Sequence, residues 1–192
     1  MTADRAASTS GGRPDHRTVD TIGHSTRSES DFLELLQRAG VRAVADVRAF
    51  PSSRRHPHFN SGSMADWLHD AGVEYVHFPG LGGRRRPRPN SANGGWREAQ
   101  FQGYADHLTT PEFERALAEL ELLAGARRTA IMCAEAVWWR CHRRLISDAL
   151  TVRGWLVEHL GVGAAPARHE LPSFAVVQGS TITYPREQGS LL

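Results

Sequence analysis

The sequence predicts an α/β fold, a single-domain three-layer sandwich in which helices cover both faces of a mostly parallel sheet of about five strands. Two observations support this prediction. Short apolar runs alternate along the chain with amphipathic stretches of helical spacing, an order typical of parallel strands joined by helical crossovers. The chain also has 192 residues, 40% of them hydrophobic, which is enough to bury one substantial core.

The first half of the domain is predicted to alternate between strand and helix. The expected strands are residues 19–22, 41–47 and 73–78, and the expected helices are residues 31–39 and 63–71. Ser28 or Ser30 is a suitable N-cap for the first of these helices, and Gly40 is a suitable stop.

The second half begins with a loop, residues 81–95, that is rich in glycine, arginine, proline and asparagine. Loops of this length are usually functional or mobile. Pro111 follows Thr110 at a position that favours the first turn of a helix. The elements expected after the loop are helices at residues 97–108 and 111–124, a strand at 129–132, a helix at 139–152 and a strand at 155–160.

The two ends of the chain fall outside this alternation. Residues 1–17 are small and polar, so we expect a disordered tail that lacks the apolar segment of a signal peptide. Residues 18–160 form the expected α/β domain, and residues 161–192 form a C-terminal extension in which 173–177 and 181–184 fit a hairpin. No apolar run approaches the roughly 20 residues that span a bilayer. These features predict a cytoplasmic protein with no membrane partner.

Polar or glycine-rich segments follow four of the predicted strands, at the point where each apolar run stops. They are Gly23-His24-Ser25, Asp46-Val47-Arg48, Gly82-Gly83-Arg84 and Cys133-Ala134-Glu135. Parallel strands place their carboxyl ends at one edge of a sheet, and ligands of open α/β sheets bind at that edge. We therefore expect these segments to form one crevice.

Three side chains in these segments are candidate catalytic residues: Cys133, Glu135 and His24. Cys133 precedes a predicted helix, and the dipole of that helix together with nearby arginines favours a thiolate. Glu135 can act as an acid or a base, or bind a ribose hydroxyl, and His24 can transfer a proton near neutral pH. The alternatives are a small buried hydrophobic residue at Cys133 and a hydrogen-bonded histidine beside a helix cap at His24.

A second group of residues is expected to bind the substrate. The glycine- and arginine-rich loop either holds phosphate through N–H and guanidinium groups or is a solvated insertion. Asp46 and Arg48 share one face of a strand, so they either form a buried ion pair or leave Arg48 to bind an anion. The candidate substrate-binding residues are Gly23, Ser25, Asp46, Arg48, Gly82, Gly83, Arg84, Cys141, His142 and Arg143.

The two cysteines of the chain do not have the C-x-x-C spacing of a redox pair or a zinc knuckle. Cys141 taken alone is better interpreted as a structural residue than as a reactive one. His142 and Arg143 open the predicted helix, so their side chains can reach back to the crevice. No metal ligand is assigned on this basis, and the cofactor stays undetermined.

Four motifs of this chain resemble a known family. Thr21-Ile22-Gly23-His24-Ser25, Asp46-Val47-Arg48, Leu81-Gly82-Gly83, and Cys133-Ala134-Glu135 with Cys141-His142-Arg143 occur here in the order found in the family of domain of unknown function 488. The resemblance spans residues 18–160. It implies a compact α/β fold and transfers no activity.

Three functions are consistent with these residues. The first is a thiol- or carboxylate-dependent enzyme that acts on a phosphate-bearing substrate, a nucleotide or a nucleic acid. The second is a nucleic-acid-binding module without catalysis, in which arginines bind phosphates and an exposed tryptophan stacks on a base. The third is a metal- or haem-binding protein that uses Cys133, Cys141, His142 and His24. The oligomeric state is open in all three.

Overall fold

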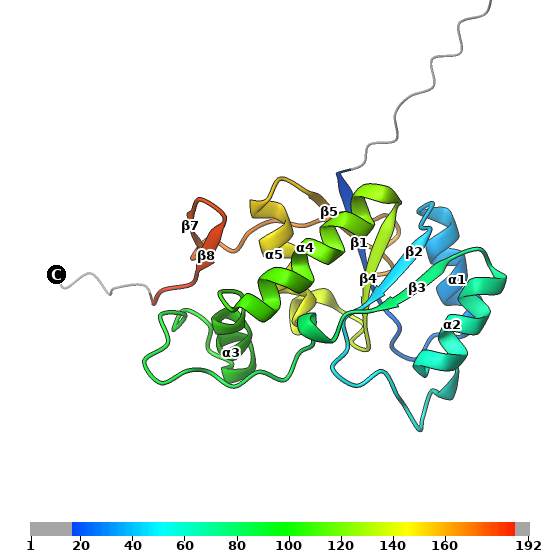
Figure 1. Ribbon diagram of the computed structural model, residues 1–192, viewed down its shortest axis with the longest axis horizontal. Helices are drawn as coiled ribbons and strands as arrows, with labels where there is room; N and C mark the ends of the chain where they lie inside the picture. The colour runs from blue at the N-terminus through cyan, green and yellow to red at the C-terminus, as the bar shows by residue number, and fades with distance from the viewer. Residues whose placement is uncertain (1–16, 187–192) are drawn as a thin grey trace, which may run out of the picture.

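The computed structural model describes residues 17–186, which form the predicted α/β fold (Figure 1). The main sheet contains β1 (Thr18–Gly23), β2 (Ala43–Asp46), β3 (Glu74–His77), β4 (Thr129–Cys133), β5 (Leu156–His159) and β6 (Ala167–Arg168). Its strand order is β3-β2-β4-β1-β5-β6. The first five strands pair in parallel, and β6 pairs antiparallel with β5. Residues 1–16 of the expected tail and residues 187–192 of the extension lie outside the described residues.

Five α-helices lie between residues 17 and 186. They are α1 (Glu29–Arg38), α2 (Ser61–Asp70), α3 (Ala99–His107), α4 (Pro111–Ala126) and α5 (Arg143–Val152). Three short 3-10 helices join them: η1 (Pro57–Phe59), η2 (Pro79–Leu81) and η3 (Trp138–Arg140). Within this described part of the chain, no helix is both long and apolar enough to cross a membrane.

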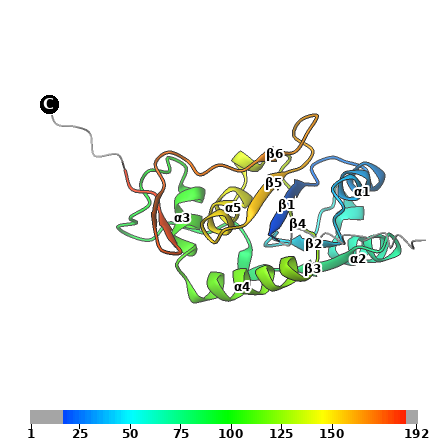
Figure 2. The ribbon, with the colours of Figure 1, turned by 90° about the horizontal axis from the view of Figure 1, so that it is seen from above.

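The helices cover both faces of the sheet, as predicted. Figure 2 shows α1 and α2 on one side and α3, α4 and α5 on the other. A hydrophobic core lies on each face of the sheet, and successive side chains of β4 point to opposite faces. Ala130 and Met132 pack with α1 and α2, whereas Ile131 and Cys133 pack with α4 and α5. This alternation is the two-residue period of a strand that is buried on both faces.

Local capping explains where two helices begin. The Ser28 hydroxyl accepts a hydrogen bond from the Asp31 N–H (3.1 Å), and the Thr110 hydroxyl accepts one from the Phe113 N–H (3.2 Å). Each bond satisfies an N–H group that has no partner inside its own helix. Gly40 has a φ of +68°, which a side chain would disfavour, and it follows the end of α1. The N-cap at Ser28, the stop at Gly40 and the helix start at Pro111 confirm the expectations from the sequence.

The loop before α5 differs from its prediction. The helix expected at residues 139–152 begins at Arg143, because η3 and the extended Cys141 (φ −126°, ψ 148°) come first. The predicted hairpin is present as β7 (Val176–Gln178) and β8 (Thr181–Thr183), with Gly179 (φ +60°) in its turn. The edge strand β6 was not predicted, because two residues carry no periodic signal.

A chain of buried polar side chains attaches the C-terminal extension to the sheet. The Tyr184 hydroxyl donates to Asp148 (2.7 Å), and Asp148 lies 2.7 Å from His169. His169 in turn lies 3.0 Å from His159, which is 2.7 Å from the Thr21 hydroxyl. All five side chains are almost fully inaccessible to solvent. A hydrogen-bonded network of this kind specifies one position for the extension.

This network predicts a loss of stability at acidic pH. Burial, with the nearby His169 and Arg143, lowers the pKa of His159 to about 3, whereas an unfolded histidine has a pKa of about 6.5. The proton therefore binds the unfolded state more tightly, so the contribution of His159 is complete above about pH 6.5 and is lost as the pH falls. We expect this group alone to lower the free energy of unfolding by about 2 kcal/mol between pH 7 and pH 5.

Urea unfolding at several pH values measures this effect. His159→Gln should be less stable than the wild type at pH 7.5 but should depend less on pH. His69→Gln, at an exposed position on α2, should keep the wild-type dependence. Equal pH dependence in His159→Gln and the wild type would contradict the assignment.

Candidate functional site

The carboxyl ends of four parallel strands meet at one edge of the sheet. The His24 N–H donates to the Cys133 carbonyl, the Val47 N–H to the Met132 carbonyl, and the Phe78 N–H to the Asp46 carbonyl, each over 2.9 Å. These bonds continue the pairing of β1 with β4, of β2 with β4 and of β3 with β2 beyond the ends of the strands. The segments after these strands are therefore neighbours, as the sequence predicted.

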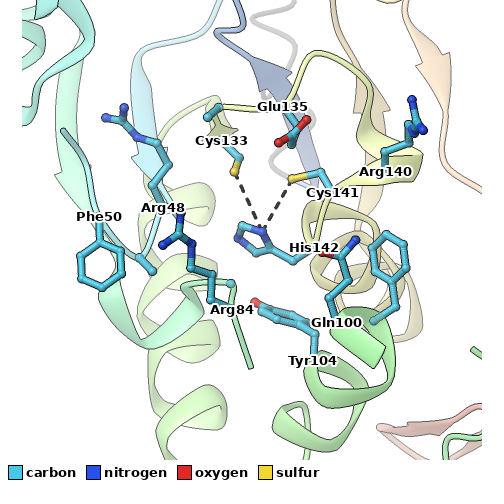
Figure 3. Close-up of a pocket in the computed structure, with 14 residues that line it drawn as sticks. Arg48, Phe50, Arg84, Gln100, Tyr104, Cys133, Glu135, Arg140, Cys141 and His142 are labelled. Atoms are coloured by element: carbon cyan, nitrogen blue, oxygen red, sulfur yellow. Dashed lines mark hydrogen bonds between the residues drawn. The ribbon is translucent and has the colours of Figure 1, made fainter. Parts of the chain in front are cut away.

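A pocket of about 250 Å³ opens at this edge (Figure 3). The loop between β4 and α5 supplies much of its wall, and the segments after β2 and η2 and the helix α3 supply the rest. The lining residues are Arg48, Ala49, Phe50, Gly83, Arg84, Gln100, Phe101, Tyr104, Cys133, Ala134, Glu135, Arg140, Cys141 and His142.

Both cysteines and one histidine gather in this pocket. His142 Nδ1 lies 3.9 Å from Cys133 Sγ and 3.7 Å from Cys141 Sγ, and the two thiols are free. His142 Nε2 lies 2.8 Å from the Val47 carbonyl oxygen. A carbonyl can only accept, so Nε2 carries a hydrogen, and in the neutral imidazole the lone pair of Nδ1 faces the sulfur atoms. We call Cys133, Cys141 and His142 the Cys/His centre.

The two thiols differ in acidity. The hydrogen bond with Cys141 and burial raise the pKa of the Cys133 thiol well above its usual value. Burial alone would raise the pKa of Cys141 too, but the Cys133 thiol, His142 and Arg143 hold it well below the usual value. The Arg143 Nε–H points at Cys141 Sγ over 3.5 Å. Cys141, which the sequence suggested is structural, is thus the sulfur better placed to carry negative charge.

Arg143 also fixes the loop that carries the pocket. This side chain is buried, and its Nη2 donates to the Glu135 carbonyl over 2.6 Å. Gly23 packs against the same carbonyl, where a Cβ would lie 1.8 Å from the oxygen. Gly83 approaches the ring of His142 in a similar way, because its Cβ would lie 2.8 Å from Nδ1. Both glycines are needed for close backbone approach.

Asp46 and Arg48 form the buried ion pair that was one of the two sequence interpretations. Arg48 Nε lies 2.9 and 3.0 Å from the two carboxylate oxygens of Asp46, and the Tyr75 hydroxyl donates to the same carboxylate over 2.7 Å. Arg48 also lines the pocket. Its position there is consequently fixed by the carboxylate.

His24 lies at the same sheet edge but does not line the pocket. Its ring stacks on Phe59 with centroids 4.4 Å apart, and its Nε2 is 3.4 Å from Arg48 Nη1. Burial and the charge of Arg48 lower the pKa of His24 to about 4. The side chain is therefore neutral near pH 7 and contacts the ion pair, whereas the sequence suggested a proton carrier in the crevice.

The other candidate residues divide into two groups. Arg48, Gly83, Arg84, Cys133, Glu135, Cys141 and His142 line the pocket. Gly23, Ser25, Asp46, Gly82 and Arg143 do not, although Gly23, Asp46 and Arg143 support residues that do.

Several lining residues were missed as site residues by the sequence analysis. Arg140 stands out only as one basic residue among several, and Tyr104 lies on α3 without any polar motif around it. The Tyr104 hydroxyl donates to the Leu81 carbonyl over 2.6 Å, and its ring packs beside His142. Phe50 follows the Asp46-Val47-Arg48 motif closely, and it is 66% exposed. The guanidinium of Arg84 lies 5.5 Å from the centre of its ring.

Fold and site together define an α/β protein with a pocket of thiol, imidazole and guanidinium groups at the carboxyl edge of its sheet. The chain belongs to the family described as Domain of unknown function DUF488, whose model matches residues 28–150. The match includes the motifs that begin at Asp46, Leu81, Cys133 and Cys141, and it starts after Gly23-His24-Ser25. No curated protein and no solved structure matches the chain at a significant level.

Proposed function

We propose that this protein is an enzyme that binds a phosphate-bearing substrate, a nucleotide or a nucleic acid, and transforms it at the Cys/His centre. One observation carries the proposal: a single pocket joins that centre to arginines that have no carboxylate partner. Among residues 17–186, neither Arg84 nor Arg140 forms a salt bridge. Guanidinium groups without an internal partner are suited to bind phosphate through paired N–H groups.

The third arginine of the pocket supports the same substrate class. Arg48 is held by Asp46, so its guanidinium lies at the pocket in a fixed position. A donor group that is already oriented binds an anion without the entropy cost of ordering a long side chain. Three arginines around a volume of about 250 Å³ favour a ligand that has at least one phosphate group.

The chemistry belongs to the Cys/His centre and to Glu135. The lone pair of His142 Nδ1 faces both thiols, which lets the imidazole accept a proton from either sulfur. Glu135 is exposed at the pocket and is free to exchange a proton with a substrate or with water. The free thiols fit a reducing compartment, so the proposal includes a cytoplasmic location.

A nucleic-acid-binding module is the second candidate, because of one surface feature. The exposed ring of Phe50 beside Arg84 is suited to stack on a base next to a bound phosphate. Such a module would bind nucleotides without changing them. Product analysis therefore separates it from the enzyme.

Binding of a matched pair of ligands tests the phosphate site. We expect the protein to bind a 5′-nucleoside monophosphate at least about tenfold more tightly than the corresponding nucleoside in calorimetric titrations. Arg84→Gln and Arg140→Gln should each lower the affinity for the monophosphate by about tenfold, because each removes one phosphate contact. Arg115→Gln, at an exposed position on α4, is the matched control and should have no effect. Equal affinity for both ligands would contradict the phosphate site.

Turnover tests the enzymatic part. Incubation with a panel of nucleotides and short single-stranded oligonucleotides, followed by chromatography, should show a product that Cys141→Ser and His142→Ala no longer form. Binding of these ligands with no product from any of them would instead support the module without catalysis.

A further inference from the structure

We infer that Cys133 Sγ, Cys141 Sγ and His142 Nδ1 form a binding site for one zinc ion, with a fourth coordination position that opens into the pocket. The inference deepens the proposed function, on which it rests for the use of the metal in catalysis. The presence of the site is measured separately from any activity.

The spacing of the three ligand atoms fits tetrahedral zinc. Bond lengths of about 2.3 Å to sulfur and about 2.05 Å to nitrogen require sulfur and nitrogen ligands to lie about 3.6 Å apart. His142 Nδ1 lies 3.9 Å from Cys133 Sγ and 3.7 Å from Cys141 Sγ. All three atoms lie within 4.8 Å of one another. Only small side-chain movements are needed to place one ion between them.

The hydrogen bond of the His142 imidazole leaves Nδ1 available to bind a metal. Nε2 donates its hydrogen to the Val47 carbonyl, which leaves the lone pair of Nδ1 directed at the sulfur atoms. Metal-binding histidines almost always donate their second N–H to a carbonyl or a carboxylate, because this bond fixes the ring and its tautomer. Gly83 adds a further constraint, since its backbone packs so closely on the ring that a Cβ would lie 2.8 Å from Nδ1.

The two cysteine residues also have supporting contacts. Arg143 Nε–H points at Cys141 Sγ, and the carbonyl of Cys133 accepts a hydrogen bond from the His24 N–H. Both cysteines are buried, with 7% and 3% of their surfaces exposed for Cys133 and Cys141. Two soft thiolates and one imidazole are a ligand set typical of zinc. The loop between β4 and α5 thus holds three suitable donors in place before any ion binds.

The fourth position faces the pocket because all three ligands line it. Among residues 17–186, no further cysteine, histidine or carboxylate joins this group. Structural zinc sites are closed by four protein ligands, whereas catalytic sites have three and bind water or substrate at the fourth position. Glu135 lines the same pocket and is suited to accept the proton that such a water releases. A zinc ion bound there would supply Lewis-acid chemistry to the arginine-bound substrate.

Metal content is the decisive measurement. Full-length protein without a histidine tag, reduced and then equilibrated with a slight excess of Zn²⁺, should retain about one zinc per chain after gel filtration. Replacement of zinc by Co²⁺ should give the intense visible absorption of tetrahedral cobalt and the near-ultraviolet bands of thiolate ligands. Cys133→Ser and Cys141→Ser should each reduce the intensity of the thiolate bands by about half. Each should also lower the affinity for zinc, measured against a competing chelator, by at least about tenfold.

Two further variants are controls for the assignment of the metal ligands. Arg140→Gln and Glu135→Gln change pocket residues that are not ligands, so both should retain one zinc with the wild-type cobalt spectrum. Circular dichroism shows whether the cysteine variants are folded, and His142→Ala provides an independent ligand deletion. Retention of far less than one zinc by the reduced wild type, or a disulfide between Cys133 and Cys141 that forms in place of metal binding, would overturn the inference.

The two proposals can fail separately. If the protein binds phosphate ligands but does not retain zinc, the proposed arginine pocket stands and its chemistry comes from the thiols. Stoichiometric zinc without any preference for phosphate ligands would leave a metal site and remove the proposed substrate class.

Discussion

Gly23→Ala is expected to destabilise the protein by about 3 kcal/mol, because the new methyl group would occupy space that is already filled. A Cβ at this position would lie 1.8 Å from the Glu135 carbonyl oxygen and 2.9 Å from Arg143 Nη2. The carbonyl is backbone, and the guanidinium is buried and bonded to it over 2.6 Å, so neither can move cheaply. The loop between β4 and α5 would have to shift, and the pocket with it.

Urea unfolding monitored by circular dichroism measures this loss. Gly125→Ala is the matched control, because Gly125 lies in α4 and, apart from the backbone of that helix, no atom lies within 4 Å of the place that the new methyl group would take. Alanine favours helix over glycine, so the control should be neutral or more stable by up to about 1 kcal/mol. Wild-type stability for Gly23→Ala would show that the loop is not held as described.

Asp46→Ala should cost about 3–5 kcal/mol, the usual result of removing one partner from a buried ion pair. Asp46 is fully buried and Arg48 is 5% exposed. The substitution leaves the Arg48 guanidinium without its counter-charge and deprives the Tyr75 hydroxyl of its acceptor. Because Arg48 lines the pocket, phosphate binding should weaken together with stability.

An exposed ion pair supplies the comparison. Glu34 and Arg38 form a salt bridge across one turn of α1, and both side chains are more than half exposed. Glu34→Ala should change the free energy of unfolding by no more than about 0.5 kcal/mol, since solvent screens such pairs. Similar losses in Asp46→Ala and Glu34→Ala would contradict the role given to burial.

The sequence predicted the elements that depend on local signals. Apolar periodicity located the five parallel strands, and Ser28 and Pro111 marked the starts of two helices. The convergence of four strand ends followed from the geometry of parallel sheets, and the family was identified from its motifs. The start predicted for α5 was wrong. The residues of η3 and its flanking turn have types that also fit a helix, so the sequence does not separate them from α5.

The sequence alone therefore determined the α/β fold, the family and the sheet edge at which polar residues gather, because short-range patterns specify strands, helices and caps. Only the tertiary structure decided which of those residues form a pocket. His142 is oriented by the carbonyl of Val47, which is 95 positions away in the sequence, and Tyr104 lies on a helix that has no polar motif. His24 is turned toward Phe59 and Arg48 instead. Side-chain direction at a strand end depends on packing between distant segments, which one-dimensional spacing does not contain.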